Sequence, residues 1–171
     1  MSKTKKRGFE VISKYIDADI QLPKRATKYS AGYDFYAAED IVVPSMMKQL
    51  KKHTQSNESE SKQALTSTLV PTGIKAYMPE NEYLMLANRS SNPMKYQLAI
   101  PNGMGIIDAD YYGNTKNEGE IFLQLINYGF ENHTIRKGDR ICQGIFMPFL
   151  TVDNEEESIA SREGGFGSSG Q

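Results

Sequence analysis

The sequence predicts an all-β domain of the sandwich, barrel or jelly-roll kind. Short runs rich in β-branched and aromatic residues recur at fairly even spacing, and turn-forming residues separate them. One stretch departs from this pattern and has the spacing of an amphipathic helix. The length of 171 residues suits a single domain with a sizeable core.

The expected strands follow one another along most of the chain. The first alternates partly between apolar and polar residues, and the segment 22–26, which contains a proline, breaks the structure after it. The run 121–127 gives the strongest strand signal. In chain order the expected strands are 9–16, 33–38, 41–44, two strands joined by a turn within 66–78, then 83–88, 106–107, 121–127, 133–135 and 141–150.

Residues 45–53 are expected to form a short helix, whose first residue is a serine that can cap the first turn. Met46, Met47 and Leu50 fall on one face of this helix, because residues three and four apart are neighbours on its surface. The polar residues 55–62 that follow have no periodicity and predict a mobile loop.

The composition excludes several classes of function. The 20 basic and 21 acidic residues nearly cancel, which argues against direct binding of nucleic acid. Cys142 is the only cysteine, so no internal disulfide can form, and a reducing cytoplasmic location is expected. No apolar run is long enough to cross a membrane, and none follows the basic first seven residues as a secretory signal requires.

The stretch 101–113 has the residues of a ligand pocket. Gly103 and Gly105 indicate a turn where the backbone comes close to another group, because glycine has no Cβ. A short apolar pair then leads to Asp108, which can hold a water as a base or cap the strand end, and Tyr111 offers a flat ring nearby. This combination is typical of a site for a small planar ligand with hydrolytic chemistry beside it.

The residues 161–171 form a second informative stretch. Their glycines and serines offer backbone N–H groups and hydroxyls for phosphate, and Arg162 adds a fixed cationic fork. Phe166 is the one large apolar residue among them and can stack on a base. The alternative interpretation is a flexible glycine- and serine-rich tail.

Three weaker candidates lie elsewhere in the chain. Arg89-Ser90-Ser91 follows a strand and can clamp phosphate. Asp34 can sit near a hydrated metal or orient a neighbouring arginine, and Gln143 can bind a ligand or face a neighbouring strand. His53 and His133 are too isolated to indicate a metal site.

Taken together, these pieces resemble the trimeric deoxyuridine triphosphatases (dUTPases). That family has five ordered motifs, and all five have counterparts here, so the resemblance spans most of the chain. Each motif alone is weak, but five in order are highly specific. The counterparts are 31–37, 89–91, 102–113, 138–143 and, for the fifth motif, Arg162 with 164–170.

The resemblance implies a distorted jelly-roll or β-barrel domain over residues 1–150, with a small inserted helix. It also implies an acidic linker and a flexible glycine-rich C-terminal arm over 151–171. The family forms homotrimers with three active sites at subunit interfaces. The implied reaction converts dUTP and water to dUMP and pyrophosphate with Mg²⁺, which limits uracil in DNA and supplies dUMP for dTMP synthesis.

The resemblance also assigns roles to individual residues. Asp108 would activate the attacking water, and Asp34 would help to hold the metal through water. Tyr111 would pack against the deoxyribose, Phe166 would cover the uracil, and the remaining positions would read the uracil edge or grip the phosphates. The implied substrate-binding residues are Arg89, Ser90, Ser91, Asn102, Gly103, Met104, Ile107, Tyr111, Gln143, Arg162, Phe166, Gly167, Ser168 and Ser169.

The chain departs from the family pattern in its motifs and in two insertions. The fifth motif is one residue shorter between Arg162 and the glycine pair, and Tyr112 stands where the third motif often has arginine. The insertions are 45–65 and 114–119. The longer one, Ser45–Leu65, resembles those of dUTPases from staphylococcal phages, some of which also bind a repressor.

The longer insertion is either a tolerated surface loop or a repressor-binding surface with its methionines and leucine as anchors. Two alternatives to a dUTP-hydrolysing enzyme remain. One is a binding protein that has the same scaffold and whose activity is switched by a bound nucleotide. The other is a dCTP deaminase, which shares the fold, although the glutamate-centred motif expected of it is not evident here.

Overall fold

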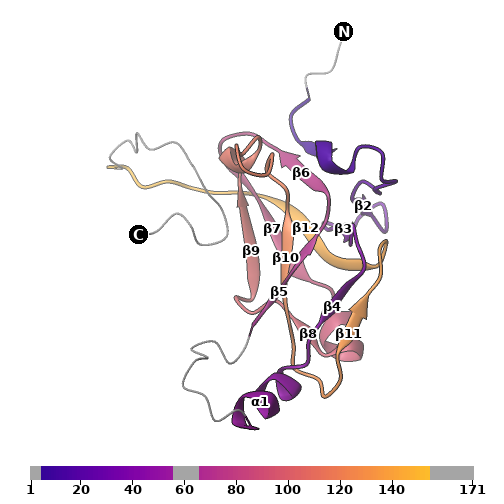
Figure 1. Cartoon of the computed structure of the whole chain (residues 1–171). Helices are drawn as coiled ribbons and strands as arrows, with labels where there is room; N and C mark the ends of the chain where they lie inside the picture. The colour runs from indigo at the N-terminus through magenta and orange to yellow at the C-terminus, as the bar shows by residue number, and fades with distance from the viewer. Residues whose placement is uncertain (1–4, 56–65, 155–171) are drawn as a thin grey trace.

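The computed structural model of the chain describes residues 5–55 and 66–154. They form a jelly roll in which antiparallel sheets surround the main core, with the helix α1 (Met46–Gln55) at one end (Figure 1). The strands are β1 (Gly8–Val11), β2 (Lys24–Arg25), β3 (Tyr33–Tyr36), β4 (Ile41–Val43), β5 (Thr68–Pro71), β6 (Ile74–Tyr77), β7 (Glu82–Asn88), β8 (Leu98–Ala99), β9 (Met104–Asp108), β10 (Phe122–Asn127), β11 (His133–Ile135) and β12 (Arg140–Pro148).

The largest sheet has the strand order β2-β3-β12-β7-β9. In it, β12 pairs with β3 on one side and with β7 on the other, and β9 forms the edge next to β7. The smaller sheets have the orders β5-β10-β8, β1-β6 and β11-β4. The predicted first, third and fourth motifs therefore lie on strands of one sheet.

The core follows from the alternation of side chains along the strands. In β10, Leu123 and Leu125 are fully buried, while Gln124 between them is half-buried. Phe35 on β3 and Leu84 on β7 are also fully buried. Full burial of one such leucine stabilises the fold by about 1.5–3 kcal/mol.

Most expected strands are confirmed to within two residues at either end. The strand expected over 9–16 is wrong in its second half, because β1 ends at Val11 and a 3₁₀ turn, η1 (Ser13–Tyr15), follows. Ile12 N donates to Gly73 O at 3.0 Å, and the turn then buries the Tyr15 ring at 5% exposure. Packing of this aromatic ring overrides the β propensity of the segment.

Three short elements elsewhere were not predicted from the sequence pattern. The segment 22–26 contains the two-residue strand β2, which pairs with β3. A π-helix, η2 (Asn92–Tyr96), and the short strand β8 follow the expected phosphate clamp. Elements this short carry no periodicity that a sequence pattern could detect.

The predicted helix is confirmed and ends two residues later than expected, at Gln55. Ser45 precedes it as predicted, because Lys48 N donates to Ser45 Oγ at 3.2 Å. Ser45 Oγ also donates to Gly129 O at 2.6 Å, which fixes the start of α1 on the β10–β11 connection. Residues 56–65, where the rest of the mobile loop was predicted, lie outside the described residues.

None of the helices in the described ranges is long and apolar enough to span a membrane. The predicted cytoplasmic location stays a prediction, as does the division at residue 150.

Candidate active site

A cleft of about 610 Å³ lies between β9 on one side and β5 and β10 on the other. Among its lining residues are the following predicted site residues: Asn102, Met104, Ile107, Asp108 and Tyr111. The opposite wall includes Gln124, whose Nε2 donates to Ser67 Oγ at 2.6 Å. Neither Gln124 nor Ser67 was predicted as a site residue. The one sequence feature that could have indicated Gln124 is its position as a polar residue between two leucines on the most strongly predicted strand.

The two glycines of the 101–113 stretch do different things. Gly103 has φ +80°, and its N–H donates to Ile100 O at 3.1 Å, so it closes the turn before β9. Gly105 lies against β7, where a Cβ would meet Leu86 Cβ at 3.2 Å. The close approach expected at Gly105 is therefore to the protein's own core, and only the turn at Gly103 is open to a ligand.

Asp108 and Tyr111 are joined by one 3₁₀ turn, η3 (Ala109–Tyr111). Asp108 ends β9 opposite Tyr83, is half-buried, and makes no side-chain capping bond to the turn. The turn brings Tyr111 back to the cleft, where the residue is 4% exposed. A carboxylate and an aromatic ring thus line one cleft, as the sequence predicts.

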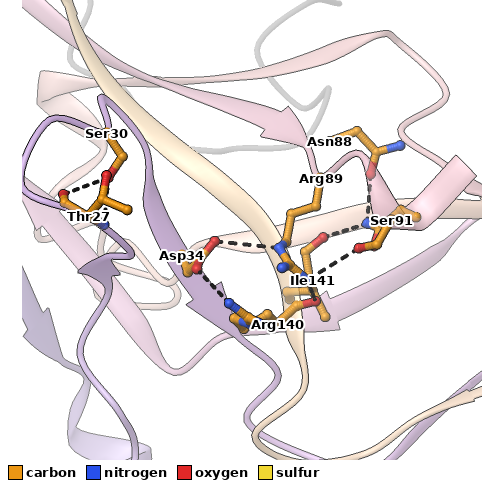
Figure 2. A network of polar contacts seen from close by, with 9 residues as sticks. Thr27, Ser30, Asp34, Asn88, Arg89, Ser91, Arg140 and Ile141 are labelled. Atoms are coloured by element: carbon orange, nitrogen blue, oxygen red, sulfur yellow. Dashed lines mark hydrogen bonds and ion pairs between the residues drawn. The ribbon is translucent and has the colours of Figure 1, made fainter. Parts of the chain in front are cut away.

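Asp34 faces two arginines (Figure 2). Its Oδ2 lies 3.3 Å from Arg140 Nη1, and its Oδ1 lies 3.5 Å from Arg89 Nε. Arg89 Nη1 also donates to Arg140 O at 3.2 Å and to Ser91 Oγ at 3.4 Å. Of the two predicted roles of Asp34, the described geometry supports orientation of neighbouring arginines.

Gln143 lies opposite Asp34 in the β3–β12 register. A Cβ on Gly32 would meet Gln143 Oε1 at 2.4 Å, so the glycine of the first motif leaves room for this side chain. Gln143 is half-buried and Ser90 is exposed, and neither lines the 610 Å³ cleft. Arg89 and Arg140 instead line a second cavity of about 260 Å³.

The register of the large sheet separates these two groups of residues. Asp34, Gln143, Ala87 and Met104 lie in one row across β3, β12, β7 and β9. Three strand spacings place Asp34 roughly 14 Å from Met104, and Asp108 lies a further ~13 Å along β9. Within one protomer the register therefore places Asp34 and Gln143 well away from Asp108.

Comparison with known proteins identifies the family. A dUTPase family model matches residues 53–170. The deoxyuridine 5′-triphosphate nucleotidohydrolase of Lactococcus lactis subsp. lactis (strain IL1403) is 45% identical over 166 residues, which cover 96% of this chain and 97% of that protein. The chain belongs to the dUTPase family. It hydrolyses dUTP to dUMP and pyrophosphate.

Solved dUTPase structures share the fold. The crystal structure of dUTPase from Streptococcus mutans is 41% identical, with a TM-score of 0.72 over 86% of this chain and 99% of that one. The dUTPase of phage phi11 of S. aureus is 18% identical, with a TM-score of 0.65 over 90% of this chain and 96% of that one. The predicted likeness to staphylococcal phage dUTPases is confirmed at the level of fold.

The remaining predicted positions of this dUTPase are placed as follows. Arg162, Phe166, Gly167, Ser168 and Ser169 lie outside the described residues. Within residues 5–55 and 66–154, no three His, Cys, Asp or Glu side chains gather into a group that could hold a metal ion.

Proposed function

We propose that this dUTPase hydrolyses dUTP at sites shared between the subunits of a homotrimer, with Mg²⁺ bound to the substrate phosphates. The observation that carries the proposal is the separation of Asp34 and Gln143 from Asp108 within one protomer. A second subunit that places its arginine cluster beside the first subunit's cleft would complete the site. Closed symmetric assembly is the usual way to form such sites.

The turn before β9 supports a role in uracil recognition. Gly103 with its positive φ exposes the backbone of Asn102 and Met104 beside the cleft. Backbone donors and acceptors tell uracil from cytosine because the hydrogen-bonding edges of the two bases differ. A site built to make those bonds leaves its own polar groups unpaired with the wrong base, which gives discrimination of several powers of ten.

The other residues of this wall would activate the attacking water and contact the deoxyribose. Asp108 would orient the attacking water and accept its proton, and Tyr111 would pack against the deoxyribose and exclude a 2′-hydroxyl. Ile107 directly precedes Asp108 on β9 and is 7% exposed, so it holds this wall of the cleft in place. The carboxylate and the ring lie on opposite ends of η3, which fixes their relative position.

Phosphate binding falls to the neighbouring subunit and the arm. Arg89, Ser90, Ser91 and Gln143 would grip the phosphates. Arg162, Ser168 and Ser169 would take the γ-phosphate, with Phe166 and Gly167 closing over the base. Such closure excludes water from the reacting groups.

The described residues fit a metal that arrives with the substrate. Mg²⁺ commonly keeps several waters and binds one or two carboxylates together with substrate phosphates. Asp34 is 7% exposed and already faces two arginines, so its role would be in the outer sphere, through water. The ion would supply charge neutralisation on the phosphates.

Mixing of two inactive variants tests the shared site. Asp108→Asn and Arg89→Ala subunits are each expected to form inactive homotrimers. An equal mixture that is unfolded and reassembled should recover about a quarter of the wild-type rate. Each site needs an intact Asp108 from one subunit and an intact Arg89 from its neighbour, and each of these is present in about half of the cases. Absence of recovery in reassembled trimers would place the whole site in one protomer.

A second role is favoured by the surface of α1. Met47 and Leu50 are each 37% exposed on this short helix, so these two of the three predicted anchors can contact a repressor protein. Met46, the third predicted anchor, is half-buried. Ser45 itself is fully buried and serves the fold instead. The dUTPase of staphylococcal bacteriophage 80alpha, 19% identical to this chain, controls transfer of virulence genes by a proto-oncogenic G protein-like mechanism.

Serine substitutions at Met47 and Leu50 test this second role. The doubly substituted enzyme should hydrolyse dUTP at the wild-type rate and lose the ability to release a repressor from its operator DNA. Equal release by the two enzymes would count against α1 as the repressor-binding surface.

A further inference from the structure

The polar loop 114–119, which the family pattern lacks, forms a compact turn directly behind Tyr111. Asn114 N donates to Tyr111 O at 3.2 Å, and Glu118 N donates to Asn114 O at 2.7 Å. Gly113 N in turn donates to Glu118 O at 3.1 Å. The loop therefore closes on itself and returns to the backbone of Tyr111.

Asn117 carries this loop to the Tyr111 side chain. Its Nδ2 donates to the Tyr111 hydroxyl at 2.7 Å, and the hydroxyl donates to Glu120 O at 3.0 Å. The single proton of the hydroxyl is thus given to Glu120 O, while one of its lone pairs accepts from Asn117. A ring that lines the cleft is held at its far end by two hydrogen bonds.

The orientation of the Asn117 amide is fixed by a third partner. Gly119 N donates to Asn117 Oδ1 at 3.1 Å, and a backbone N–H can only donate. The oxygen must therefore face Gly119, which leaves Nδ2 facing the tyrosine. Asn117 is half-buried, so water competes only in part for these bonds.

The loop is also tied to the rest of the fold. Glu118 accepts hydrogen bonds from Ser13 N at 3.2 Å and from Ser13 Oγ at 3.1 Å, and it pairs with Lys75 at 3.3 Å. Gly119 packs so tightly that a Cβ there would lie 2.5 Å from Tyr111 O. The support behind the tyrosine is therefore anchored to β6 and to the N-terminal turn η1.

We propose that Asn117 is a positioning residue that sets the Tyr111 ring and thereby the preference for deoxyribose over ribose. The proposal rests on the role proposed above for Tyr111. A ring excludes a 2′-hydroxyl only while it stays in contact with the sugar, and shifts of about 0.5 Å are enough to loosen such contacts. The hydrogen bond from Asn117 adds to the one that the Tyr111 hydroxyl donates to Glu120 O, and the two bonds together restrict the tilt of the ring.

Asn117→Asp is the sharpest test, because aspartate keeps an oxygen for Gly119 N but removes the donor to Tyr111. The tyrosine hydroxyl has one proton, so it can then serve the introduced carboxylate or Glu120 O, but not both. We expect the ratio of kcat/KM for dUTP to that for UTP to fall about fivefold, the effect of one hydrogen bond. The change should lie mainly in KM, and calorimetry should show a matching loss in the preference for dUMP over UMP.

A double-mutant cycle separates positioning from a purely structural role. In Tyr111→Phe the hydroxyl is absent, so Asn117→Asp should lower the ratio no further in that background. Equal effects in the two backgrounds, or no effect in either, would overturn the proposal. Lys116→Ala, an exposed side chain on the same loop, is the matched control and should leave the ratio unchanged.

Two further variants keep the outcome decisive. Should Asn117→Asp fail to fold, as judged by thermal denaturation, Asn117→Ala removes the same donor without adding charge, and the same cycle applies. Tyr111→Ala checks the underlying role. If it retains the wild-type preference for dUTP over UTP, the sugar-packing role fails and the proposal with it. If it loses that preference while Asn117 variants keep it, only the positioning role is wrong.

Discussion

Arg89 Nε lies 3.5 Å from Asp34 Oδ1, and it is a buried nitrogen that makes no hydrogen bond within the described residues. The carboxylate is therefore the charge that compensates this guanidinium, at a distance slightly too long for a hydrogen bond. Arg140 on β12 shares the same carboxylate at 3.3 Å. The Arg89 and Arg140 guanidinium groups thus depend on one carboxylate.

Asp34→Asn should weaken the fold and the binding of dUTP together. Removing one partner of a buried ion pair costs about 3–5 kcal/mol, but the Arg89 and Arg140 side chains are 19% and 50% exposed, so we expect about 1–2 kcal/mol. Urea unfolding measures this loss, and KM for dUTP should rise because Arg89 is no longer held.

Asp40→Asn is the matched control for the Asp34 variant. Asp40 pairs with Arg136 at 2.7 Å, but the two side chains are 54% and 69% exposed. Exposed pairs contribute little, so this variant should match the wild type in both stability and KM. A loss as large as that of Asp34→Asn would mean that burial of the cluster is not what makes Asp34 important.

Asp108→Asn should abolish most of the catalysis while leaving substrate binding. An amide keeps the size of the side chain but cannot accept the proton of the attacking water, so kcat should fall by about 10²- to 10⁴-fold. Pyrophosphate release measures the rate, and calorimetry with a non-hydrolysable dUTP analogue measures binding. Asp110→Asn, two residues along η3, should retain far more activity, and equal losses would remove the assignment of Asp108 as the base.

Glu120 and Glu118 should show opposite pH dependence of stability. Burial raises the pKa of Glu120 above its ordinary value, and the hydrogen bond from Gly73 N opposes this only in part. As pH rises, the Glu120 carboxyl loses its proton at a lower pH in the unfolded state than in the folded state. The folded state therefore loses stability as pH rises from the Glu120 pKa of the unfolded state to that of the folded state. Glu120→Gln should therefore melt higher than the wild type at neutral pH, with the difference vanishing below the unfolded pKa.

For Glu118 the sign is reversed. Hydrogen bonds from the side chain and backbone of Ser13 lower the pKa of Glu118, so its contribution is present above the unfolded pKa and is lost as pH falls through the folded pKa. Glu118→Gln should melt lower than the wild type at neutral pH and match it in acid. The same sign for the two variants would contradict the described hydrogen bonds of this loop.

The sequence predicts the parts of this molecule that have a period or a motif. The strands and the capped helix were placed because apolar alternation and helical spacing extend over several residues. The 3₁₀ turn at Ser13–Tyr15 was missed because one buried aromatic ring decides it, and no local pattern records that packing. Local preference is overridden by tertiary contacts in such places.

The site divides in the same way. Asp108 and Tyr111 were predicted and line one cleft, since Tyr111 follows Asp108 by only three positions in the chain. Asn117 and Gln124 were not predicted, because only the fold brings each of them to its hydrogen-bond partner, the Tyr111 hydroxyl and Ser67 Oγ respectively. The pairing of Asp34 with Arg140 depends on the β3–β12 register, which joins residues 106 positions apart.

Gly119 and Gly138 offer a comparison of two glycines with the same backbone angle and different surroundings. Gly119 has φ +87° and Gly138 has φ +85°, a region that costs an L-residue about 1 kcal/mol. A Cβ on Gly138 meets nothing within 4 Å, whereas one on Gly119 would lie 2.5 Å from Tyr111 O and 3.1 Å from Tyr112 Cα. Both of these neighbours are backbone atoms, which cannot move without shifting η3.

Gly138→Ala should therefore lower the free energy of unfolding by about 1 kcal/mol, and Gly119→Ala by about 3 kcal/mol or more. Urea denaturation of the two variants beside the wild type measures the difference. Gly119→Ala should also increase the turnover of UTP relative to dUTP, because the displaced backbone is that of Tyr111. Equal stability losses would show that the 114–119 loop is free to move away from Tyr111, and an unchanged nucleotide preference would show that such movement does not reach the ring.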